Sequence, residues 1–194
     1  IFVQKNRSRA EWMNYFWNYD NALCNPSSLI RRELRARKSR YGITCWQLPD
    51  FFLWIDLVQC CDFYVIPRTL IKMRRHQKKN VSNMSILSDE TRIRGGVEMG
   101  ANWINVIRDM KKELFREAFA DSMVYPDADS DVEIKCEKYF MLLNHKNLFV
   151  QNSAFIYLHE NINDIQDCLN EKYKYSRICI KEDATKKGLA KYFL

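Results

Sequence analysis

Residues 97–121 read VEMGANWINVIRDMKKELFREAFAD, and this stretch carries the most regular apolar pattern in the chain. Its apolar side chains recur at steps of three and four residues, which places them on one side of an α-helix. They are Met99, Trp103, Val106, Ile107, Met110 and Leu114. Charged residues lie largely around this stripe, so we predict an amphipathic helix from about 97 to 121 that packs on a core.

The composition extends this helical prediction to the whole chain. Only 5 Gly and 4 Pro occur in 194 residues, whereas sandwiches and barrels need turn residues at short intervals. The apolar content of 47% is ordinary for a globular protein and argues against disorder. We therefore expect a mainly α protein, a compact single domain over 1–194 with about seven helices.

Local signals place further helices. Two capping boxes, Ser8 with Glu11 and Ser130 with Glu133, each open a helix. The first helix should end near Asn25, because the residue before a proline is pushed out of the helical region. Another helix should begin at Asn163 or Asp164.

Three further segments complete the pattern. Apolar residues nearly encircle a helix over 51–66, so this helix should lie at the centre of the core. Residues 148–159 fit a strand or a helix. Apolar and polar residues alternate near 175–180, so a short strand there is an alternative to a helix.

The charge is unevenly distributed along the chain. Residues 1–96 hold 17 Lys and Arg against 8 Asp and Glu, a net +9, whereas residues 97–194 hold 14 against 16, a net −2. A subdivision into a basic helical half (1–79), an exposed loop or linker (80–96) and an acidic helical half (97–194) would follow this change. A basic excess confined to one half suggests a surface for an acidic partner.

Two predicted helices, over 28–40 and 67–79, carry most of this excess, with 12 Lys and Arg between them. Such residues on exposed helical faces neutralise phosphates or carboxylates. The predicted binding residues are Arg31, Arg32, Arg35, Lys38, Arg40, Lys72, Arg74, Arg75, Lys78 and Lys79. RNA, DNA, an acidic protein or an anionic membrane surface would each fit, and a solvated face without a partner is the alternative.

One acidic segment resembles a catalytic signature. Asp127, which follows Pro126, together with Glu133 and Lys135 resembles the Pro-Asp…Glu-x-Lys pattern of metal-dependent nucleases. The resemblance implies that the two carboxylates bind a divalent metal and that the lysine assists the attacking water. The spacing is short for two adjacent strands, and the capping box puts Glu133 in a helix, so caps at a helix start are the competing interpretation.

Other chemical sites find little support. The three histidines do not cluster, no Cys-x-x-Cys occurs and no glycine-rich phosphate loop is present, so we predict no metal site and no cofactor. Seven scattered cysteines favour an intracellular, reducing compartment, for which the cytoplasm, the nucleus and the mitochondrial matrix fit equally. Against it stand two glycosylation sequons, at Asn80 and Asn83. No transmembrane segment is expected, because Asp56 and Asp62 interrupt the most apolar stretch.

These observations lead to one functional hypothesis and two alternatives. The first is a non-enzymatic helical binding protein, or an accessory subunit of a larger assembly, that docks on an acidic partner through the two basic helices. The second is a divalent-metal nuclease around Asp127 and Glu133. The third is a protein–protein adaptor or effector with no role in nucleic-acid binding.

Overall fold

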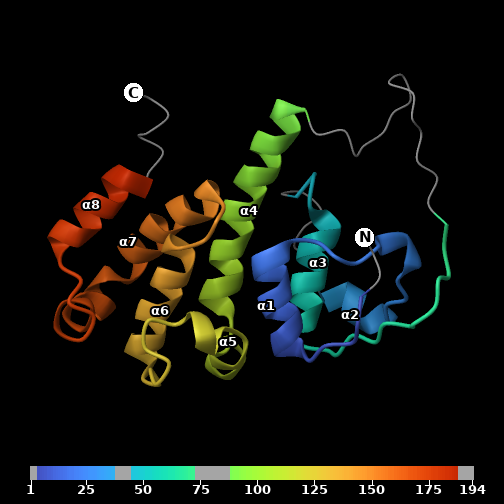
Figure 1. The fold of residues 1–194 in the computed structure, drawn as a ribbon, viewed down its shortest axis with the longest axis horizontal. Coiled ribbons are helices and arrows are strands. Elements are labelled where there is room, and N and C mark those ends of the chain that lie inside the picture. The colour runs from blue at the N-terminus through green and yellow to red at the C-terminus, as the bar shows by residue number, and fades with distance from the viewer. Residues whose placement is uncertain (1–3, 38–44, 73–87, 188–194) are drawn as a thin grey trace. The chain divides into compact units, whose positions relative to one another are not determined.

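The structure is a computed structural model that describes residues 4–37, 45–72 and 88–187 (Figure 1). The α-helices among them are α1 (Arg9–Tyr19), α2 (Arg32–Arg37), α3 (Pro49–Val58), α4 (Asp89–Asp109), α5 (Lys112–Phe119), α6 (Asp131–Leu143), α7 (Leu148–Glu171) and α8 (Arg177–Lys187). Short 3₁₀ turns occur at Asn25–Ser27 and Ala120–Ser122. No strand occurs among the described residues, so the predicted mainly α fold is confirmed. The alternative prediction of a short strand near 175–180 is wrong, since α8 begins at Arg177.

The chain divides into two compact units, Ile1–Gly95 (unit 1) and Gly96–Leu194 (unit 2). The boundary falls inside α4 and coincides with the change of charge, because residues 1–95 carry the net +9 and residues 96–194 the net −2. The expectation of one domain over 1–194 stays a prediction.

Unit 1 begins with α1, which the predicted capping box opens. The backbone N–H of Glu11 donates to Ser8 Oγ at 3.1 Å, and the N–H of Ser8 donates to Glu11 Oε2 at 2.7 Å. The helix ends at Tyr19, earlier than predicted, because Asp20 has a φ of 69° that a right-handed helix cannot contain.

The core of unit 1 consists of aromatic side chains from α1 and α3. Trp12 stacks on Phe16 with ring centroids 5.4 Å apart, and Phe16 meets Phe51 edge to face at 5.8 Å. The central helix predicted over 51–66 is correct in place but too long, since α3 ends at Val58. Beyond it, Phe63 returns to pack on the ring of Trp12 at 6.1 Å, a contact that requires the chain to leave the helix.

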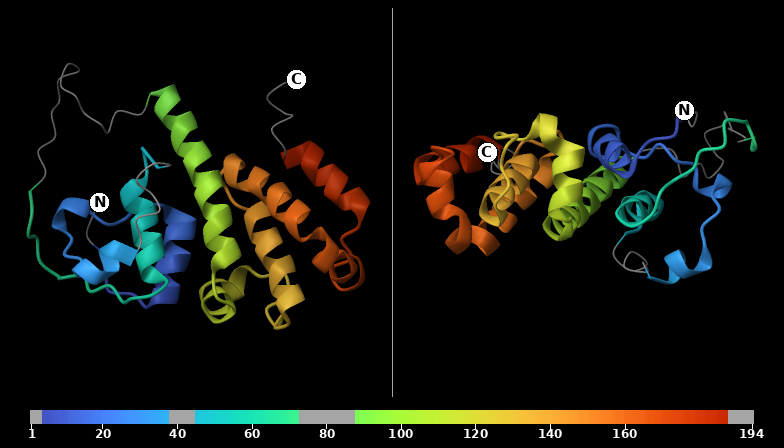
Figure 2. Two further views of the ribbon diagram at one scale, coloured as in Figure 1. Left: turned by 180° about the vertical axis from the view of Figure 1, so that it is seen from behind. Right: turned by 90° about the horizontal axis from the view of Figure 1, so that it is seen from below.

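In unit 2, α6 and α7 pack most extensively on each other, and α4 approaches the start of α7 closely. In both the front and the back view, residues 96–109 of α4 lie beside α6 and α7 (Figures 1 and 2). Gly96 and Gly100 permit this contact, because a Cβ on either would lie 2.5 Å from an atom of Phe149. Further along α4, the side chains of Trp103 and Ile107 are buried in the core, as the apolar stripe predicted.

Two helix boundaries in unit 2 differ from prediction. The helix expected over 97–121 is two helices, α4 and α5, because Lys111 adopts an extended conformation with ψ of 142°. The start expected at Asn163 or Asp164 is wrong, because α7 runs unbroken from Leu148 to Glu171. Neither α7 nor any other helix in the described ranges is long and apolar enough to cross a membrane.

Candidate functional site

The predicted basic residues lie in two segments of unit 1, of which the structure describes a part. Arg31 and Arg32 are exposed at the start of α2, Arg35 lies within α2, and Lys72 is exposed at the end of the segment that follows α3. Arg68, in the same basic run as Lys72, is exposed as well. The other predicted residues lie outside the described ranges: Lys38, Arg40, Arg74, Arg75, Lys78 and Lys79.

The structure corrects the described parts of both predicted basic helices, residues 28–37 and 67–72. α2 begins at Arg32 instead of residue 28, and residues 67–72 are not helical. The backbone N–H of Arg68 donates to the carbonyl of Ile66 at 2.8 Å in a tight three-residue turn. Asn6 also holds Val65, accepting from its N–H at 2.6 Å and donating to its carbonyl at 3.2 Å. These bonds keep the chain extended where the second helix would begin.

The two basic segments border one hollow of unit 1. This hollow has a volume of about 1110 Å³, and the side chains around it come from residues 22–34, from α3 and from residues 61–71. Trp54 and Leu57 of α3 contribute buried apolar surface to its lining. Residues as far apart in the sequence as Arg31 and Arg68 therefore share one site, which the sequence alone did not indicate.

The lining of the hollow carries charges of both signs. Arg31 and Arg68 belong to it, as do Glu33 and Asp62. Asp62 forms an ion pair with Arg9 at 3.7 Å. Among the residues that the structure describes, no acidic side chain pairs with Arg31, Arg32, Arg68 or Lys72, the four residues that we call the basic surface.

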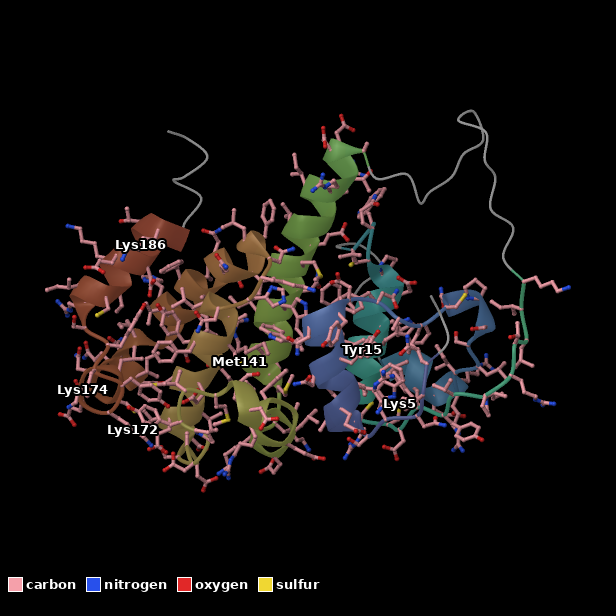
Figure 3. The ribbon with its side chains drawn as sticks, in the orientation of Figure 1. Lys5, Tyr15, Met141, Lys172, Lys174 and Lys186 are labelled. Atoms are coloured by element: carbon pink, nitrogen blue, oxygen red, sulfur yellow. The ribbon has the colours of Figure 1, made fainter. Side chains whose placement is uncertain are left out.

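The lysines and arginines of unit 2 present a contrast, because many of them are engaged within the unit. The ion pairs join Arg108 to Glu160 at 2.5 Å, Lys112 and Arg116 to Asp129 at 3.5 and 2.6 Å, Lys135 to Asp164, Lys172 to Glu133 at 2.6 Å, and Lys186 to Glu182 at 3.2 Å. Figure 3 labels Lys172 near the turn between α7 and α8 and Lys186 on α8. These six cations of unit 2 thus form ion pairs within its own fold, whereas the four cations of the basic surface form none with the described residues.

The acidic segment of the nuclease alternative is occupied by structural contacts. Glu133 accepts from the backbone N–H groups of Asp129 and Ser130, each at 3.0 Å, and from the ammonium of Lys172. The bond from Lys172, followed by those from the backbone, lowers the pKa of Glu133 to about 2. Lys135 pairs with Asp164 of α7. Glu133 is therefore a helix cap, as the competing interpretation proposed.

Within the described ranges, no group of three or more His, Cys, Asp or Glu side chains is placed to hold a metal ion. Asp127, the other candidate ligand, precedes α6, and its charge helps to raise the pKa of Lys172 after the larger effect of Glu133. The structure does not assemble Asp127, Glu133 and Lys135 into one described site.

Two of the cysteines, Cys61 and Cys136, are weak nucleophiles. All seven lie in described residues and are free thiols. Burial, with a smaller effect of Cys60, raises the pKa of Cys61 to about 11. Burial and the neighbouring Cys168 raise the pKa of Cys136 as well. A raised pKa keeps a thiol protonated and weakly nucleophilic at neutral pH.

A buried carboxylate that sequence reasoning missed holds the loop before α6. Glu137 is fully buried, yet its oxygens accept from the N–H groups of Val124 and Tyr125 at 2.7 and 2.9 Å. The hydroxyl of Tyr173 donates a third bond at 2.8 Å. The sequence held no distinct signal for this role, because α6 carries four other charged residues, Asp131, Glu133, Lys135 and Lys138.

The next residue, Lys138, is also buried, and its ammonium binds the end of α4. It is 7% exposed, and its ammonium donates to the carbonyl oxygens of Arg108 and Met110 at 3.0 and 2.8 Å. These carbonyls lie at the end of α4, so Lys138 caps this helix and favours the break before α5. Burial lowers the pKa of Lys138 to about 8, and the nearby Asp109 opposes this effect.

The buried and ion-paired charged groups of unit 2 thus have structural roles, and the hollow with the basic surface of unit 1 is the best candidate for a functional site. Comparison with known proteins adds no independent assignment. No family model matches the chain, and neither a curated protein nor a solved structure is similar to it.

Proposed function

We propose that this chain is a non-enzymatic binding protein, or an accessory subunit of a larger assembly, that docks on an acidic partner through the basic surface of unit 1. The observation that carries the proposal is the contrast between the units. The four cations of the basic surface are exposed and have no acidic partner among the described residues, whereas six lysines and arginines of unit 2 form ion pairs within that unit.

Electrostatics explains why this contrast matters. A net charge of +9 on residues 1–95 attracts an acidic molecule over a distance comparable to the Debye length, about 8 Å at physiological salt. Exposed cations that make no internal ion pair form new pairs without first breaking old ones. Their position beside one hollow concentrates this attraction on one part of the unit.

The proposal is tested by fluorescence anisotropy on the full chain. The probes are a labelled glutamate-rich peptide and a labelled single-stranded oligonucleotide, each titrated at low and at physiological salt. The variant R31E/R32E/R68E/K72E reverses the basic surface. It should bind whichever acidic probe the wild type prefers at least about tenfold more weakly, and wild-type affinity should fall as salt rises.

A matched variant controls for net charge alone. K111E/K174E/R177E/K181E reverses four exposed cations of unit 2 and changes the net charge by the same amount. It should retain wild-type affinity within about twofold. If neither probe binds at low salt, or if both variants lose affinity equally, the basic surface is not a docking site.

A further inference from the structure

We infer that the occupant of the hollow in unit 1 is an acidic polypeptide segment whose apolar side chains enter the hollow while its carboxylates meet the basic surface. This inference rests on the proposed function and narrows the acidic partner to a protein.

Exposed apolar side chains concentrate around the hollow. Leu29 is 99% exposed, Tyr64 78% and Leu70 58%, and all three line it. Ile66 and Ile71, 44% and 41% exposed, belong to the same lining. A contiguous group of exposed apolar residues marks a binding surface, because leaving it in water is unfavourable.

The hollow is also large enough for several side chains. Its volume of about 1110 Å³ exceeds the range for sites that enclose a drug-sized ligand, about 300–1,000 Å³. The buried Trp54 and Leu57 extend the apolar lining beneath the exposed residues. Peptide side chains such as Leu or Phe would cover this surface, as anchors do at the centres of protein interfaces.

Charge complementarity selects an acidic peptide. Arg31 and Arg68 lie on the lining itself, and Arg32 and Lys72 are exposed on the adjoining chain. Of the two acidic side chains on the lining, Glu33 and Asp62, the latter is already paired with Arg9. Charges at the rim of an apolar interface chiefly set specificity and the rate of association.

The chemistry of the lining favours a peptide over a nucleic acid. Single-stranded nucleic acids bind to platforms of aromatic rings beside phosphate-binding cations. Here Tyr64 is the only exposed aromatic residue on the described lining, and its exposed neighbours Leu29, Ile66 and Leu70 are aliphatic. Aliphatic side chains offer bases neither stacking faces nor hydrogen bonds, whereas they match the apolar side chains of a peptide.

Two labelled peptides of equal length and charge test the inference on the full chain by fluorescence anisotropy. One alternates Glu with Leu and Phe, and the other replaces the apolar residues with Ser. The apolar acidic peptide should bind at least about tenfold tighter than its serine counterpart. The variant L29S/L70S should remove this advantage and leave the affinity for the serine peptide unchanged, because both leucines are exposed and outside the core.

The control V97S/I178S replaces two exposed apolar residues of unit 2, 50% and 70% exposed, and should preserve the advantage. Equal binding of the two peptides, or an advantage that survives L29S/L70S, overturns the inference. If a single-stranded oligonucleotide binds tighter than both peptides and requires the basic surface, the inference fails and the proposed function stands. If no acidic probe binds, both fail.

Discussion

Because α4 lies close to α7, we expect alanine substitutions at two glycines of α4, Gly95 and Gly100, to have opposite effects on stability. A Cβ on Gly95 would meet no atom within 4 Å, whereas a Cβ on Gly100 would lie 2.5 Å from the carbonyl oxygen of Phe149. Alanine in a helix is favoured over glycine by about 0.5–1 kcal/mol, so G95A should stabilise the protein by this amount. In G100A the backbone of α7 must retreat, at a typical overpacking cost of about 1–3 kcal/mol. Net destabilisation of about 1–2 kcal/mol should remain after the helix gain.

Urea denaturation of the full chain, followed by far-UV circular dichroism, measures both effects as changes in the free energy of unfolding. In thermal melts, about 1 kcal/mol corresponds to about 2–4 °C in Tm for a chain of this size. G95A should melt higher than the wild type and G100A lower. A G100A protein as stable as G95A would refute the reasoning, because α4 and α7 could not then be in backbone contact.

Two further predictions concern the buried charges of α6. The pKa of Lys138 is about 8 in the fold and about 10.4 in an unfolded chain, so the unfolded state binds more protons between these values. The free energy of unfolding of the wild type should therefore rise with pH across this range by about 3 kcal/mol relative to that of K138M. Urea denaturation at several pH values measures both proteins. Parallel pH profiles of the two would contradict the burial of the ammonium. E137A leaves three donors without their acceptor, each costing about 1–3 kcal/mol, so it should destabilise by at least about 3 kcal/mol. The control E117A, at an exposed position of α5, should change the same measurement by less than about 0.5 kcal/mol.

Local signals in the sequence predicted the features that depend on a few neighbouring residues. The capping boxes at Ser8 and Ser130 form as expected, because their hydrogen bonds join residues three positions apart. The stripe that includes Trp103 and Ile107 is buried, because helical periodicity alone places these residues on one side. Such features need no knowledge of the rest of the chain.

Features that depend on distant residues escaped prediction. The chain leaves α3 at Val58 so that Phe63 can pack on Trp12, fifty-one residues earlier, a contact without a local signal. The end of α4 depends on Lys138, which lies on another helix.

The candidate site also depends on residues that are distant in the sequence. The basic composition of unit 1 was evident, but the hollow that gathers Leu29, Arg31 and Arg68 exists only once residues far apart in sequence meet. The bonds between Asn6 and Val65, which lies just before the predicted helix over 67–79, are likewise long-range.

The central claim is that the basic surface and the hollow of unit 1 receive an acidic partner. Its most direct test is an NMR titration of the ¹⁵N-labelled full chain with the apolar acidic peptide. The account predicts saturable chemical-shift changes in the backbone amides of residues 29–34 and 64–72, with those of α5 to α8 unchanged. Changes concentrated in unit 2, or scattered without saturation, would contradict it.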